Sequence, residues 1–117
     1  MHIDVLIIDD DPDARDLLAG LLRKHGYSVA TAADGRAGLD LLYSVRPGLI
    51  LVDLIMPIMD GATFREQQRH RRDWLSIPTI VMTGSNEEPF LDLAVEQTLR
   101  KPVHARDLLE IVRRHAV

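Results

Sequence analysis

The chain of 117 residues contains no cysteine, few aromatic residues and no long apolar run. Without cysteine, disulfides and thiolate metal sites are excluded, which fits an intracellular protein. No apolar stretch approaches the ~20 residues that a membrane-spanning helix needs, so no membrane span is expected. Residues 1–4 lack the basic start of a secretory leader, and we therefore expect a cytoplasmic protein.

An excess of positive charge is also missing, because 14 Lys and Arg stand against 18 Asp and Glu, a net charge of −4. Such a chain has no general attraction to nucleic acid or to anionic membranes, so we expect it to bind neither directly. Its length and its apolar fraction of 46% fit one globular domain, residues 1–117.

The stretch 48–61 organises the sequence. Residues 49–52 are all apolar, which is typical of a strand covered on both faces, and Asp53 follows them directly. In open α/β sheets, ligands and chemistry lie at the carboxyl ends of the strands, so Asp53 is a candidate reactive group. A carboxylate there can equally cap the next helix or face water, and this segment alone does not decide between the two.

Apolar runs and helical spacings alternate along the whole chain. Strands are predicted at 5–8, 27–32, 49–52, 77–82 and 98–100, and helices at 14–22, 37–45, 62–74, 90–95 and 103–115. Five such β–α units predict an α/β protein with parallel strands and helices on both faces. At this length we expect a doubly wound, flavodoxin-like sheet of order 2-1-3-4-5.

Polar residues follow four of the predicted strands: Asp9 and Asp10 after the first, Asp53 after the third, Thr83 after the fourth and Lys101 after the fifth. In the order 2-1-3-4-5 these four strands are neighbours, so their ends should converge on one edge. Each signal alone is weak, since an acidic run before a helix is more often just a charged helix start. The combination at four adjacent strands favours a functional site.

Carboxylates placed so close together repel one another and need a cation. Oxygen ligands without Cys or His suit Mg²⁺ or Mn²⁺. A metal, a lysine, a hydroxyl and one carboxylate nucleophile are the parts that phosphoryl transfer needs, and an aspartate can itself accept the phosphoryl group.

The chain resembles the receiver domain of two-component response regulators over essentially its whole length. Five motifs carry the resemblance, in this order: residues 5–12 (VLIIDDDP), 33–39 (ADGRAGL), 53–61 (DLIMPIMDG), 82–84 (MTG) and 101–102 (KP). The resemblance implies that Asp53 is the phosphoacceptor in a phosphorelay, receiving its phosphoryl group from a sensor histidine kinase or a phosphotransfer protein. It also implies a domain that catalyses only its own phosphorylation and dephosphorylation, and signals to a downstream protein by conformational change.

The resemblance assigns the other site residues as well. Mg²⁺ would be held by Asp9, Asp10, Asp53 and the main-chain carbonyl of Ile55. Thr83 and Lys101 would bind the phosphoryl oxygens, and the Lys101–Pro102 peptide bond would be cis.

Three features depart from the pattern of the family. Thr98 replaces the usual aromatic residue three positions before Lys101, so no ring can swing inward when Thr83 engages the phosphoryl group. The interval from Thr83 to Lys101 is about one helical turn short, and Gly84 stands where Ala is common. We therefore expect Asp53 to be phosphorylated normally, with an unorthodox response on the face formed by residues 83–98.

Two other functions are compatible with parts of the pattern. In a phosphatase of the haloacid dehalogenase type, Asp9 would be the nucleophile and Asp11 its partner, but no acidic pair follows a strand after Lys101 and no cap insertion is present. A receiver-like interaction module that takes no phosphate is the second alternative, against which the intact acidic set argues.

The remaining charged and aromatic residues have simpler interpretations. The basic run of Arg65, Arg69, His70, Arg71 and Arg72 is interpreted as a solvated helix face, with contact to an acidic partner as the alternative. Trp74 is expected to cover the edge of the core. The chain is either a free-standing receiver or a piece of a longer regulator.

Overall fold

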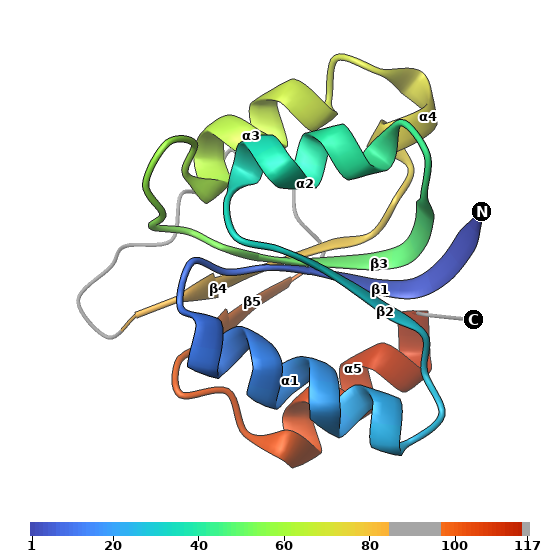
Figure 1. Ribbon diagram of the computed structural model, residues 1–117, viewed down its shortest axis with the longest axis vertical. Coiled ribbons are helices and arrows are strands. Elements are labelled where there is room, and N and C mark those ends of the chain that lie inside the picture. Colours follow the sequence, from blue (N-terminus) through green and yellow to red (C-terminus); the bar gives the residue numbers. More distant parts are fainter. Residues whose placement is uncertain (85–96, 116–117) are drawn as a thin grey trace.

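A parallel sheet of five strands lies between two layers of helices in the computed structural model, which describes residues 1–84 and 97–115 (Figure 1). In chain order the elements are β1 (His2–Ile8), α1 (Pro12–Lys24), β2 (Val29–Ala32), α2 (Gly35–Leu42), β3 (Arg46–Asp53), α3 (Gly61–Gln68), α4 (Arg72–Leu75), β4 (Thr79–Thr83), β5 (Gln97–Arg100) and α5 (Ala105–His115). The strand order is β2-β1-β3-β4-β5 with every pair parallel, which confirms the predicted fold.

The sheet has an apolar core on each face. Because side chains alternate along a strand, Leu6 and Ile50 join the core under α2 and α3, whereas Val5 and Leu49 join the core under α1 and α5. Figure 1 shows these two helical layers above and below the sheet. Burial on both faces explains why β1 and β3 are apolar without alternation.

Three helices begin with an aspartate at the carboxyl edge of the sheet. The side chains of Asp11, Asp34 and Asp60 accept hydrogen bonds from backbone amides in the first turns of α1, α2 and α3, at 2.8–3.0 Å. These caps satisfy amides that have no partner inside the helix. They fix where each helix leaves the strand before it.

The loop between β3 and α3 closes tightly over the end of β3. The amide of Gly61 donates to the carbonyl of Leu54 at 2.8 Å, and a Cβ on Gly61 would lie 2.5 Å from the carbonyl oxygen of Asp53. Ile58, in the same loop, has a φ of 68° and is 84% exposed. The backbone of Asp53 is thus held by its own loop.

Several sequence-based boundaries are wrong. The helix predicted at 62–74 is two helices, α3 and α4. The buried side-chain amide of Gln68 donates from Nε2 to the carbonyl of Trp74 at 2.8 Å and holds a turn between them. The second helix, predicted at 37–45, runs from Gly35 to Leu42, and the strand predicted at 49–52 already begins at Arg46. In α1, the buried residues are Leu18, Ala19 and Leu22, whereas the apolar Leu17 is 73% exposed.

The interpretation of the basic run as a solvated face fails at one position. Arg65 is buried and its guanidinium donates to the Thr79 hydroxyl at 3.4 Å, inside a network that also contains Gln68. Trp74 is 7% exposed and covers the core edge, as expected. The helix predicted at 90–95 lies outside the described residues.

The described part of the chain contains no helix that combines the length and the apolar character required to cross a bilayer.

Candidate functional site

The ends of four strands bring the predicted polar residues to one edge of the sheet. Asp9 follows β1, Asp53 and Thr83 are the last residues of β3 and β4, and Lys101 follows β5. The strand register pairs Ile8 with Val52, Asp53 with Met82 and Thr83 with Arg100, so all four ends are level.

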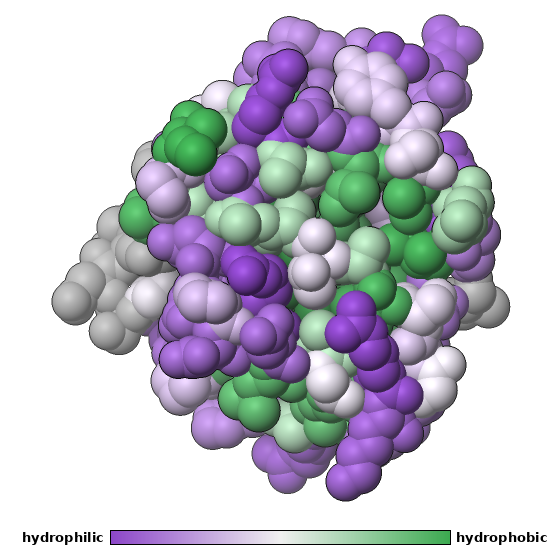
Figure 2. Space-filling view, in the orientation of Figure 1, coloured by the Kyte–Doolittle hydropathy of each residue, from purple (hydrophilic) through white to green (hydrophobic). Residues whose placement is uncertain are grey.

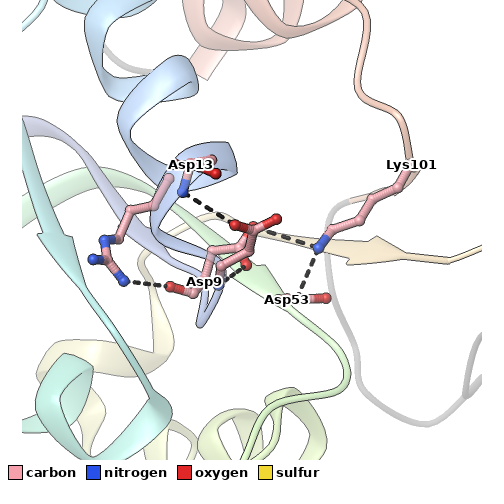
Figure 3. A network of polar contacts seen from close by, with 6 residues as sticks. Asp9, Asp13, Asp53 and Lys101 are labelled. Carbon is pink, nitrogen blue, oxygen red and sulfur yellow. Dashed lines mark hydrogen bonds and ion pairs between the residues drawn. The ribbon is translucent and has the colours of Figure 1, made fainter.

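Lys101 connects these ends. Its ammonium lies 2.8 Å from Oδ2 of Asp53 and 3.4 Å from Oδ2 of Asp9 (Figure 3). Its backbone amide donates to the carbonyl of Thr83 at 2.7 Å. The Lys101–Pro102 bond is cis, as the resemblance implied. The two side-chain contacts show that the ammonium points at the two buried carboxylates.

Three carboxylates form a cluster with the composition of a divalent cation site. One oxygen each from Asp9, Asp10 and Asp53 lies within 4.8 Å of the others. Asp9 and Asp53 are buried and Asp10 is exposed, so the cluster opens to solvent on the Asp10 side. Lys101 balances only one of the three negative charges, and a hard divalent cation would neutralise the rest. The donor set thus fits Mg²⁺ or Mn²⁺.

Burial changes the acid–base properties of the central pair. Removal from water, opposed by the contact with Lys101 and assisted by the charge of Asp9, raises the pKa of Asp53 to about 6. Burial alone would lower the pKa of Lys101, but its contacts with Asp53 and Asp9 outweigh burial and raise it. Above pH 6, therefore, Asp53 is ionised and Lys101 is charged.

Asp9 is held by backbone and side-chain groups that the sequence analysis did not single out. Arg15 donates from Nη1 to the Asp9 carbonyl at 2.9 Å, and the amide of Asp11 donates to Oδ1 of Asp9 at 3.0 Å (Figure 3). Asp13 continues this chain of contacts by donating its amide to Asp11. The start of α1 brings Arg15 near the end of β1, but its contact with the Asp9 carbonyl depends on side-chain packing that the sequence does not reveal.

Three other positions named in the sequence analysis differ in their exposure to solvent. Ile55 lies in the loop after β3 with its side chain 57% exposed, and its carbonyl remains a predicted ligand. Thr98, where the family usually has an aromatic ring, is exposed on β5. Thr83 is buried, 3% exposed, at the end of β4.

A cavity of about 460 Å³ lies beside the cluster. Asp9 and Lys101 contribute polar groups to its wall, and Leu18, Met82 and Val103 contribute apolar side chains. The contact between Lys101 and Asp9 therefore borders this cavity.

Comparison with known proteins identifies the family. Residues 5–113 match the response regulator receiver domain. The chain belongs to the receiver domain family. The response regulator MprA of Mycolicibacterium vanbaalenii is 36% identical over 117 residues, which cover 97% of this chain and 50% of MprA. The sensor histidine kinase TmoS of Ectopseudomonas mendocina is 34% identical over 108 residues, covering 89% of this chain and 11% of the kinase.

Solved structures agree with this assignment. The chemotaxis protein CheY4 of Vibrio cholerae superposes with a TM-score of 0.88 at 28% identity, covering 98% of this chain and 99% of that one. The chain spans half the length of MprA and a small part of TmoS, so receiver domains of this kind occur within longer proteins. The predicted family, its fold and its place in two-component signal transduction are confirmed.

Proposed function

We propose that this receiver domain accepts a phosphoryl group on Asp53 from the phosphohistidine of a sensor histidine kinase or a phosphotransfer protein. One observation carries the proposal: Asp53 is a carboxylate, only 4% exposed, 2.8 Å from the Lys101 ammonium and inside a cluster of three carboxylates. Burying several carboxylates costs folding free energy. Phosphoryl transfer can use the carboxylates as nucleophile and metal ligands, and the ammonium as a partner of the phosphoryl oxygens.

In this mechanism an Asp53 oxygen attacks phosphorus, the new O–P bond forms, and the bond to the donor nitrogen breaks. Asp9, Asp10, Asp53 and the Ile55 carbonyl would hold Mg²⁺ (or Mn²⁺), which supplies charge neutralisation when bound. Lys101 pairs with a phosphoryl oxygen as it leaves Oδ2 of Asp53, and the Thr83 hydroxyl donates a hydrogen bond to another. The receiver contributes positioning and charge, and modifies only itself.

The response to phosphorylation is proposed to bypass a threonine–aromatic exchange, because Thr98 has no ring. A phosphoryl group adds about two negative charges and new acceptor oxygens, enough to shift a loop between two arrangements. The loop after β3 and residues 85–96, which lie outside the described part of the chain, are the expected movers. A downstream protein in the cytoplasm would recognise the change. Spectra recorded with and without a phosphoryl mimic test this; no shift around residues 83–98 would exclude signalling through that face.

Intact mass after incubation with acetyl phosphate tests acceptance itself. The wild type should gain one phosphoryl group in Mg²⁺ and none after chelation, whereas Asp53→Asn should gain none in either buffer. Asp40→Asn, an exposed carboxylate on α2, is the matched control and should behave as the wild type. No mass gain in the wild type would favour an interaction module that takes no phosphate.

A further inference from the structure

A second surface lies at the opposite end of the sheet, around α4, where cationic and aromatic side chains meet. The Arg71 guanidinium carbon is 4.7 Å from the ring centroid of Trp74 and 5.2 Å from that of Tyr43. The two rings pack edge to face at 5.0 Å. Arg71 and Tyr43 are exposed, so this stack presents a positive charge and an aromatic face to solvent.

The stack is built on a fixed backbone. The carbonyl of Arg71 accepts hydrogen bonds from the backbone amides of Trp74 and Leu75 at 3.1 and 2.9 Å. The buried side-chain amide of Gln68 donates to the carbonyl of Trp74. Arg46, the first residue of β3, donates to the carbonyl of Asp73 at 3.1 Å and joins the same surface. The cations are therefore held in place before any partner arrives, which lowers the entropic cost of binding.

The surface is also hollowed. A cavity of about 150 Å³ lies between the end of α2 and α4, and Arg46, Arg71, Tyr43 and Trp74 line it with Asp73. Figure 2 shows hydrophilic side chains gathered over α3 and around α4 on the face in view. Tyr, Trp and Arg are the residues most enriched where binding energy concentrates in protein interfaces.

The charge of this surface selects its partner. Arg46, Arg71 and the adjacent exposed Arg72 outnumber Asp73, in a chain whose net charge is −4. We propose that this surface, formed by Arg46, Tyr43, Arg71 and Trp74, binds an acidic segment of a partner protein, with a carboxylate received between Arg46 and Arg71. The match is electrostatic and apolar at once, because a carboxylate pairs with the guanidinium groups while its methylene stem packs on Tyr43.

Binding here leaves the phosphoacceptor edge open. Arg46 begins β3 and Asp53 ends it, a span of about 23 Å at ~3.3 Å per residue. Figure 1 shows α4 at the end of the sheet opposite the loops that carry the site. A partner held at α4 could stay bound while Asp53 meets its phosphodonor, and the proposal does not depend on phosphorylation.

Trp74 provides the test, because it is the sole tryptophan of the chain. Titration of the full chain with hexaglutamate at low salt should change Trp74 emission saturably, and hexalysine should not. Arg71→Gln and Arg46→Gln should each weaken hexaglutamate binding at least about fivefold, whereas Arg113→Gln, an exposed arginine on α5, should weaken it less than about twofold.

The variants separate a specific surface from general charge attraction. Arg46→Gln removes no member of the stack of Arg71 on Trp74, so it tests the surface even where Arg71→Gln alters the emission of the free protein. Backbone amide shifts of residues 71–75 on peptide addition provide a second readout and should accompany the emission change. No saturable change in the wild type, or an equal loss in Arg113→Gln, would overturn the proposal.

Discussion

At the residue scale, the site depends on one buried carboxylate that the fold keeps at a cost. Asp53 is 4% exposed and shares its surroundings with Asp9, and burial is the main reason that its pKa rises to about 6. Lys101 offsets part of this penalty through the 2.8 Å contact. Asp53 destabilises the folded domain and yet completes a carboxylate cluster that can bind a cation. Its presence is therefore better explained by a functional role than by packing.

Replacing Asp53 by Asn should therefore stabilise the metal-free domain. The unfolded carboxyl ionises near pH 4 and the folded one near pH 6, so the wild type loses stability as pH rises between these values and keeps a constant penalty above them. At pH 7.5 the gain for Asp53→Asn should be about 1–3 kcal/mol, and it should shrink toward pH 4. Urea unfolding in chelator at several pH values measures it; a gain that does not depend on pH would contradict the assigned cause.

Lys101→Ala should leave acceptance in place and weaken the response. Without the ammonium, Asp53 keeps its carboxylate and its metal partners, but the phosphoryl oxygen loses the charge that ties it to β5 and the start of α5. Phosphorylation is followed by intact mass, and the response by amide shifts after phosphorylation. Lys24→Ala, an exposed lysine on α1, is the control; a full response in Lys101→Ala would remove Lys101 from the switch.

At the scale of single elements, the sequence predicts those strands and helices whose positions depend on the pattern of apolar residues. Strands β1 and β3 are evident from unbroken apolar runs, and Asp34 and Asp60 mark helix starts because aspartate caps amides. The break between α3 and α4 could not be predicted, since it depends on Gln68 reaching the carbonyl of Trp74, a contact between positions that share no periodic signal. Arg65 was misjudged for the same reason, because a buried arginine needs partners on another element.

Gly61, at the start of α3, is a position where a single added methyl group should disturb the site. A Cβ there would meet the backbone of Asp53 and Leu54 at 2.5 and 2.9 Å, and backbone cannot yield as a flexible side chain can. Gly61→Ala should cost about 2 kcal/mol of unfolding free energy and slow phosphorylation.

Gly20→Ala is the matched control for Gly61→Ala. Gly20 lies inside α1 with open space around the position of a Cβ, so the same substitution should stabilise the domain by about 0.5–1 kcal/mol. Denaturant unfolding measures the change in stability of both variants relative to the wild type. If the two substitutions shift the midpoint in the same direction, the tight closure of the β3–α3 loop is not what holds Asp53.

At the scale of the whole molecule, the site is a consequence of topology. The strand order β2-β1-β3-β4-β5 places Asp9, Asp53, Thr83 and Lys101 at one edge of the sheet. The sequence could therefore predict which residues meet. It could not predict that Arg15 holds the Asp9 carbonyl, or that Arg71 stacks on Trp74, because these contacts depend on side-chain packing rather than on strand order.

Metal binding should stabilise the folded domain as a whole, because the ligand set exists only after folding. At Mg²⁺ or Mn²⁺ concentrations tenfold above the dissociation constant, unfolding should cost about 1.4 kcal/mol more. Asp10→Asn, an exposed member of the cluster, should lose this gain, whereas Asp16→Asn on α1 should keep it. Thermal unfolding with and without metal measures the difference; equal gains in both variants would place the cation elsewhere.

The central claim is that Asp53 carries the phosphoryl group. The most direct measurement is peptide mapping of the domain phosphorylated in Mg²⁺, with the acyl phosphate trapped by reduction before digestion. The account predicts that the modified residue is Asp53. Modification of Asp9 instead, with Asp53 unlabelled, would contradict it and indicate the chemistry of an aspartate-nucleophile phosphatase.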